Sequence, residues 1–286
     1  MASDSDLLLE VHAQSGFLSN FATKRPILLF FLLAYTLGWG MIMPRVLSWL
    51  GILSFKVPDW WITASFYAPC IGALWMQWLT KRNLRVCRLY ASWDKLVLGT
   101  VVGAFLVLLC NTVIPALLAE RTPIHTLRWK IFLALASYRL HFSDLIVPIG
   151  EEIGWRGYLL PRLQTRSGPV WASILVGLMW AGFMLPALTM VQMWASSVIL
   201  IYAVGLIALS IEMTFAMNLS GFSIVVALVM NTLAATKTGY FARGLIARAE
   251  PRSHSEWIWS ISNLLVPLFL VFATRGRLAA RSADQS

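Results

Sequence analysis

The sequence predicts an all-α, polytopic membrane protein with about eight transmembrane helices in one bundle. Hydrophobic residues make up 58% of the 286 residues and charged residues only 13%, well below the roughly 25% charged share of ordinary soluble chains. Mean hydropathy is +0.71. A single compact core cannot hide this much apolar surface in so short a chain. Lipid must therefore solvate much of it, which excludes disordered, collagen-like and disulfide-framework proteins and argues against a secreted soluble enzyme.

Uncharged runs give the order of the spans, since a helix needs about 20 mostly apolar residues to cross the hydrocarbon. Arg139, His141 and Asp144 interrupt the fourth run, and the fifth and sixth spans share one uncharged stretch divided near residues 186–197. Glu212 is expected near a helix end, and residues 218–221 form the opening turn of the seventh span. The predicted spans are residues 26–44, 60–80, 96–119, 129–150, the two halves of 167–211, 213–236 and 257–274.

One transmembrane domain, residues 24–274, is expected between a polar tail (1–23) and a basic tail (275–286). The first tail has acids but no Lys or Arg, so it lacks the basic region of a cleaved signal peptide and the first span is expected to be retained. With both termini cytoplasmic, thirteen Lys and Arg fall on that side and nine on the other, in the sense of the positive-inside rule. The membrane is either a bacterial inner membrane or a eukaryotic endomembrane.

The partners follow from the way the charges are distributed. The net charge of +10 comes from short clusters of Lys and Arg between apolar runs, which suits anionic lipid headgroups rather than nucleic acid. Cys70, Cys87 and Cys110 form no CxxC pattern and are interpreted as packing residues. Membrane lipids and a membrane-associated peptide or lipidated protein are therefore the expected partners.

Two adjacent acids and an arginine in residues 148–161 form the segment with the clearest chemical content. On a helix Glu152 and Arg156 are four apart and share a face, while Glu151 is rotated by about 100° and is left unpaired. A carboxylate without a cationic partner suits a general base that polarises a water, so Glu151 is the candidate base. Glu152 and Arg156 are expected to fix the helix and to hold a substrate carbonyl or carboxylate.

A purely structural interpretation of the same segment is also open. Pro148 and Gly150 are typical of a helix start, acids in a first turn gain from the helix dipole, and Arg156 can face lipid phosphates. Ionisable groups inside a membrane are more often functional, because burying each costs about 2.5–3.5 kcal/mol on insertion scales.

Three motifs resemble those of the CPBP family (CAAX-protease and bacteriocin-processing proteins, also called Abi). Residues 151–163 resemble its EExxxR motif with the WRGYLLP continuation, residues 177–186 (GLMWAGFMLP) its second motif, and residues 220–231 its third. Residues 24–39 and 67–74 also look similar to bacterial members. The CPBP-like core covers about residues 129–236. The resemblance implies a helical intramembrane endopeptidase related to enzymes that trim prenylated CAAX tails, with the first glutamate and a second-motif histidine activating a water.

Three positions depart from that pattern. Met184 stands at the second-motif histidine, Asn231 at the third-motif histidine and Ala235 at the third-motif asparagine. The thioether of Met184 cannot act as a general base. The amide of Asn231 still donates hydrogen bonds, whereas Ala235 provides neither a base nor a donor. Loss of an acid–base partner typically costs about 10²–10⁴ in rate, so a weak or inactive protease is expected. The predicted site is Glu151, Glu152, Arg156 and Asn231, with Met184 and Ala235 as degenerate positions and Trp155, Trp180, Phe183 and Glu212 as cleft lining.

No metal or other cofactor is expected, because the chain has no HExxH pattern and Met184 removes a ligand. His141 or Asp144 can join the site only if Pro148 and Gly150 bend the helix. Two other function classes stay open. One is a non-catalytic scaffold or immunity protein that keeps the cleft. The other is an ion-coupled transporter using Glu151, Glu212 and Asp144, which the absence of an internal repeat disfavours.

Overall fold

Helices make up every regular element in the described part of the chain. The computed structural model describes residues 19–81, 83, 85–89, 91–114, 142–189, 196–235 and 252–280. The elements are α2 (Pro26–Trp49), α3 (Asp59–Ser65), α4 (Ala68–Lys81), α5 (Trp93–Leu108), the π-helix η1 (Leu109–Val113), α8 (Phe142–Glu152), the π-helix η2 (Ile153–Leu159), α9 (Leu160–Thr189), α10 (Ser196–Leu219), α11 (Ile224–Ala235) and α13 (Arg252–Ala273). The predicted all-α class is confirmed.

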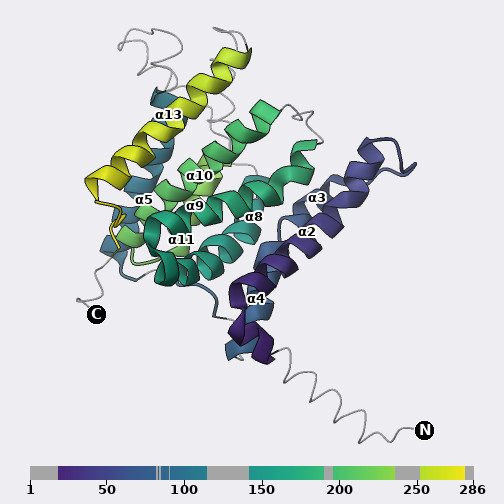
Figure 1. The fold of residues 1–286 in the computed structure, drawn as a ribbon, viewed down its shortest axis with the longest axis horizontal. Coiled ribbons are helices and arrows are strands. Elements are labelled where there is room, and N and C mark those ends of the chain that lie inside the picture. The colour runs from purple at the N-terminus through teal and green to yellow at the C-terminus, as the bar shows by residue number, and fades with distance from the viewer. Residues whose placement is uncertain are drawn as a thin grey trace, which may run out of the picture.

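The helices pack side by side in one bundle (Figure 1). Helices α2, α3 and α4 form one flank, α5 and α13 the opposite flank, and α8 to α11 lie between them. Within the described residues, three segments are long and apolar enough to cross a membrane, namely Pro26–Trp49, Ile146–Leu188 and Ile199–Leu219. The protein is a polytopic membrane protein, and the count of eight spans stays a prediction.

The first motif lies inside a helix rather than at its start. Helix α8 runs through Pro148, and the helical path continues through η2 into α9 until Gly168, whose φ of 74° and ψ of 170° break it. The predicted helix start at Pro148 and Gly150 is therefore wrong. Gly150 has a packing role instead, because a Cβ there would lie 2.7 Å from the carbonyl oxygen of Phe66.

The turn between α10 (Ser196–Leu219) and α11 (Ile224–Ala235) overlaps the turn expected at residues 218–221, but the expectation that Glu212 lies near a helix end is wrong. Helix α10 continues past Glu212 to Leu219, and α11 begins at Ile224. Glu212 is fully buried, and the thiol of Cys110 donates a hydrogen bond to its Oε1 at 3.0 Å. A partner on a distant segment thus lets a carboxylate lie within a helix where an uncharged-run count places an end.

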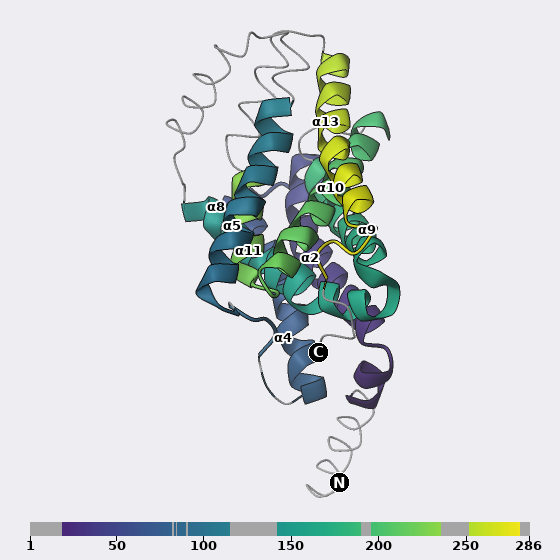
Figure 2. The same ribbon diagram turned by 90° about the vertical axis from the view of Figure 1, so that its left-hand side faces the viewer.

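Several chain turns gather at one end of the bundle, which we call the basic end. Its segments are residues 19–25, 79–81, 85–89, 162–168, 218–224 and 274–280 (Figure 2). The amide of Ile224 donates to the carbonyl of Arg88 at 2.9 Å, and Asn218 Nδ2 donates to the carbonyl of Leu278 at 2.8 Å. The two ends of the described chain are near this end of the bundle (Figure 2).

Glycines let the motif segments approach their neighbours closely, as small residues do between membrane helices. A Cβ on Gly154 of η2 would lie 2.4 Å from the Cβ of Pro69 in α4. A Cβ on Gly177 of α9 would lie 2.6 Å from the Cα of Ile207 in α10. These contacts fix η2 and α9 against the rest of the bundle.

Replacing Gly154 with Ala is expected to destabilise the protein by about 1–3 kcal/mol, because the nearest atoms include the backbone of Pro69 and cannot rotate away. Gly40→Ala is the matched control. Gly40 is exposed in α2 with no atom within 4 Å of its ideal Cβ, so the change is expected to stabilise by up to about 1 kcal/mol. Thermal unfolding in detergent measures both, and equal midpoints would contradict the close approach.

Candidate active site

The two acids lie at the junction of α8 and η2, deep in the bundle. Glu151 is 3% exposed, Glu152 is fully buried and Arg156 is 1% exposed. The first motif therefore presents its charges to the protein interior rather than to lipid. The acids are followed by the π-helix η2, and π-helical turns are uncommon and frequently occur at functional sites.

Glu152 and Arg156 form the predicted i,i+4 ion pair. Arg156 Nη1 donates to Glu152 Oε1 at 3.1 Å. The guanidinium carbon also lies 4.2 Å from the ring centroid of Trp180, within the range of a cation–π contact. The interpretation of Arg156 as a ligand of lipid phosphates is therefore wrong, and this arginine does not count toward the cytoplasmic charge bias.

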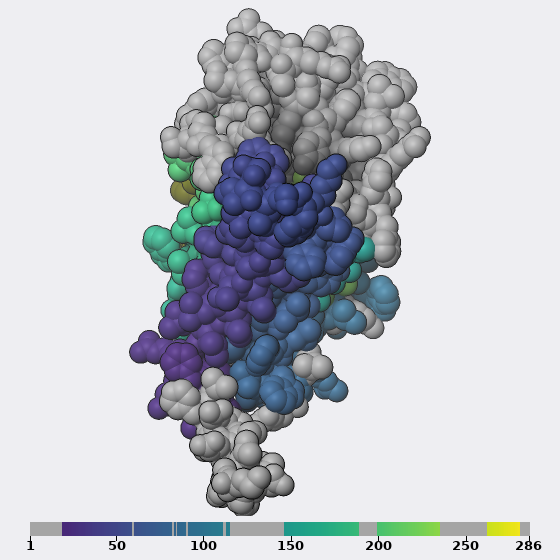
Figure 3. Space-filling model, turned by 90° about the vertical axis from the view of Figure 1, so that its right-hand side faces the viewer, coloured from purple at the N-terminus to yellow at the C-terminus, as the bar shows by residue number. Residues whose placement is uncertain are grey.

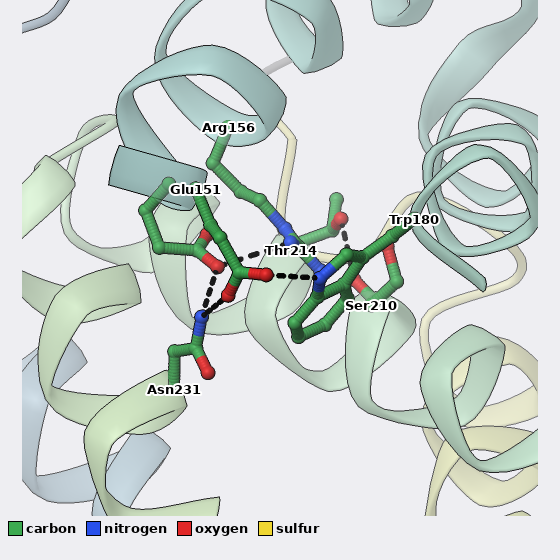
Figure 4. A network of polar contacts seen from close by, with 7 residues as sticks. Glu151, Arg156, Trp180, Ser210, Thr214 and Asn231 are labelled. Atoms are coloured by element: carbon green, nitrogen blue, oxygen red, sulfur yellow. Dashed lines mark hydrogen bonds and ion pairs between the residues drawn. The ribbon is translucent and has the colours of Figure 1, made fainter. Parts of the chain in front are cut away.

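Glu151 is held by two uncharged donors. Trp180 Nε1 donates to Oε1 at 3.1 Å, and Asn231 Nδ2 donates to Oε2 at 3.1 Å (Figure 4). The same Nδ2 donates to Glu152 Oε1 at 2.7 Å. Because an amide nitrogen carries only two N–H groups, Asn231 uses both of them on the acids. Helices α8, α9 and α11 thus converge on one cluster, which we call the carboxylate cluster (Glu151, Glu152, Arg156, Trp180 and Asn231).

Some buried polar atoms of this region have no hydrogen-bond partner among the described residues. They include Glu152 Oε2 and Arg156 Nη2 in the cluster, together with Ser210 Oγ of α10, a residue drawn beside the cluster in Figure 4. Buried polar groups are nearly always hydrogen-bonded, so each of these atoms has capacity for a further partner. The cluster can therefore accept and donate at least one more bond in a dry environment.

The family model described as type II CAAX prenyl endopeptidase Rce1-like matches residues 133–241. Over these residues the chain is similar to the CAAX-protease-like proteins of the CPBP family, which supports the resemblance of its sequence motifs. The matched segment contains every member of the carboxylate cluster. No curated protein matches the chain significantly.

Among the positions that depart from the CPBP pattern, Asn231 lies in the carboxylate cluster. Met184 is partly buried against the main apolar core, one helical turn after Trp180. Ala235 is the last residue of α11, and its side chain lies outside the described residues. The residue that bonds Glu151 from the second motif is Trp180, which the sequence indicated only as lining. Its place one turn before Met184 is the signal that could have assigned this role.

Trp155 and Phe183, the other expected lining residues, are packed in the core. Their ring centroids are 5.6 Å apart in an edge-to-face arrangement. Trp155 Nε1 is buried without a hydrogen-bond partner among the described residues. Both rings lie beside the motif segments and shape the apolar surroundings of the acids.

Glu212, the remaining predicted lining residue, lies in a different contact. Glu212 accepts a hydrogen bond from Cys110 of η1, so Cys110 is not only a packing residue. Within the described residues no hydrogen bond joins Glu212 to Glu151. His141 lies outside the described residues, as does the side chain of Asp144. The described part of the chain contains no group of three or more His, Cys, Asp and Glu that could hold a metal ion.

Proposed function

We propose that the chain is a glutamate-dependent intramembrane endopeptidase that cleaves a membrane-associated, lipid-modified peptide slowly. The match to the CAAX prenyl endopeptidase model supports the reaction class and the prenylated-peptide substrate class. The main observation behind the proposal is that the two acids have different kinds of partner. Arg156 pairs with Glu152 while both oxygens of Glu151 accept bonds only from neutral side chains.

This arrangement assigns a role to each group in peptide hydrolysis. Glu151 removes a proton from water, whose oxygen bonds to the scissile carbonyl carbon. The oxyanion accepts a hydrogen bond from Arg156 Nη2, which has no partner among the described residues. When the C–N bond breaks, Glu151 returns the proton to the leaving amine. Every atom and charge of the hydrolysis is then accounted for by water and the carboxylate cluster.

Two features support slow turnover. Asn231 must release at least one of its bonds to the acids before it can donate to an oxyanion. The thioether of Met184 offers no proton to the leaving group. The basic end supports a cytoplasmic position for both termini, so the proposed substrate enters from the cytoplasmic leaflet.

Glu151→Gln is expected to reduce cleavage of a fluorogenic prenyl-peptide by at least about 10²-fold, because glutamine keeps the shape but cannot take up a proton. Glu212→Gln is the matched control, since it neutralises another fully buried acid away from the carboxylate cluster. It is expected to cleave like the unchanged protein. The assay uses the full chain purified in detergent. Equal traces of product from the unchanged protein and from Glu151→Gln would contradict the proposal.

A non-catalytic binding function is the second candidate. The observation in its favour is that Asn231 donates hydrogen bonds to both acids, so that neither of its N–H groups is left for a substrate. It predicts that a prenyl-peptide binds equally well to the unchanged protein and to Glu151→Gln, with no product from either over long incubation. Fluorescence anisotropy of the labelled peptide, followed by mass spectrometry of the same sample, separates binding from hydrolysis.

A further inference from the structure

A groove at the basic end combines positive charge with an apolar wall. It lies between the first turns of α2 and the middle of α9 and has a volume of about 360 Å³. Figure 3 shows the purple surface of α2 bordered by the teal surface of the later helices on this flank. We call it the headgroup groove, and its lining residues are Lys24, Arg25, Ile27, Leu28, Phe31, Arg166 and Met179.

Three cations from distant parts of the chain meet in this groove. Lys24 and Arg25 directly precede α2, whereas Arg166 lies two residues before the break at Gly168. All three side chains are exposed, and no acidic side chain of the described residues pairs with them. Like charges held close together repel, so an anion bound among them stabilises the arrangement.

The apolar wall begins where the cations end. Ile27, Leu28 and Phe31 follow Arg25 along the first turns of the spanning helix α2, and Leu28 is 48% exposed. Met179 lies on α9 on the opposite side of the groove. A ligand that fits must therefore carry a negative group at the membrane surface and a hydrocarbon chain directed into the bilayer. A free phosphate would contact the cations of the groove but not its apolar wall.

We propose that the headgroup groove binds one anionic phospholipid, with its phosphate among Lys24, Arg25 and Arg166 and an acyl chain along Leu28 and Phe31. This binding goes beyond the proposed peptidase function, because none of the groove residues belongs to the carboxylate cluster. Each basic residue near an anionic surface contributes a moderate attraction. Removal of all three is expected to weaken binding on the order of 100-fold.

The test measures binding of fluorescently labelled phosphatidylglycerol to the full chain in neutral detergent. The triple variant Lys24→Gln, Arg25→Gln, Arg166→Gln is expected to lose about 100-fold in affinity. The control triple variant Lys81→Gln, Arg275→Gln, Arg277→Gln removes the same charge from exposed positions at the same end. It is expected to bind within about threefold of the unchanged protein. Equal losses in the two variants would overturn the proposal, since they would show attraction to overall charge.

Competition distinguishes a phospholipid from a free anion. Unlabelled phosphatidylglycerol is expected to displace the labelled lipid, whereas glycerophosphate, inorganic phosphate and phosphatidylcholine are expected to leave it bound. Displacement by inorganic phosphate at equal concentration would show an anion site without an acyl subsite and would overturn the proposal. Arg166→Gln alone, which is expected to cost about fivefold, serves if the triple variant does not fold.

Discussion

Replacing Arg156 with Met is expected to destabilise the protein by about 3–5 kcal/mol, the largest stability effect of any single change in the carboxylate cluster. The variant keeps much of the side-chain volume but leaves Glu152 fully buried without its cation. Glu152 Oε1 would retain only the bond from Asn231, and Oε2 has no partner among the described residues. The contact with the Trp180 ring is lost at the same time.

The double variant Glu152→Gln, Arg156→Met tests the cause. Removing both charges of a buried pair is often close to neutral, because the desolvation cost of the ions disappears with their attraction. The double variant is therefore expected to regain most of the lost free energy of unfolding. Arg162→Met is the control, since Arg162 is half-buried, stacks on Tyr158 and, among the described residues, bonds neutral acceptors. Its expected cost is about 1–2 kcal/mol.

Unfolding in mixed micelles with increasing anionic detergent measures all three variants. If the double variant is as unstable as Arg156→Met, packing around the arginine matters more than its charge, and the argument from the ion pair fails. If Arg162→Met lowers the free energy of unfolding as much as Arg156→Met does, the loss at Arg156 does not depend on its buried partner acid.

The spacing of residues 151 to 156 was enough to predict the Glu152–Arg156 pair, because four residues bring two side chains to one face of a helix. The bond from Trp180 to Glu151 was not predictable in this way. It depends on how α9 is placed against α8, and contacts of α9 with other helices, such as the close approach of Gly177 to Ile207 of α10, contribute to that placement. Local pattern therefore predicts contacts within one helix, whereas contacts between helices depend on packing that no single segment encodes.

The error at Glu212 has a similar origin. Uncharged runs place a helix end at an isolated acid, since a carboxylate in lipid is costly. A hydrogen bond from Cys110, more than one hundred positions away, offsets part of this cost at Glu212. The π-helical turns η1 and η2 were likewise invisible to a 3.6-residue pattern, although both carry a polar residue of the interior, Cys110 in one and Arg156 in the other.

Introducing histidine at both departed positions, Met184→His with Asn231→His, is expected to raise prenyl-peptide cleavage by about 10²–10⁴-fold, the usual contribution of one positioned acid–base group. Trp180 already reaches Glu151, and residue 184 lies one helical turn further on the same helix, so its side chain shares that face of α9. A histidine there can protonate the leaving amine. A histidine at 231 frees one of the bonds that now tie the acids together.

The control pairs the same chemical changes with a different place on α9. Met179→His with Asn231→His moves the first histidine to the headgroup groove, on the side of α9 that faces α2, and is expected to cleave no faster than Asn231→His alone. Adding Glu151→Gln to the Met184→His, Asn231→His variant is expected to abolish the gain, because the new groups assist the glutamate and do not replace it. A folded variant that binds the peptide without any gain in hydrolysis would show that the catalytic frame itself has been lost. The carboxylate cluster would then be a binding site.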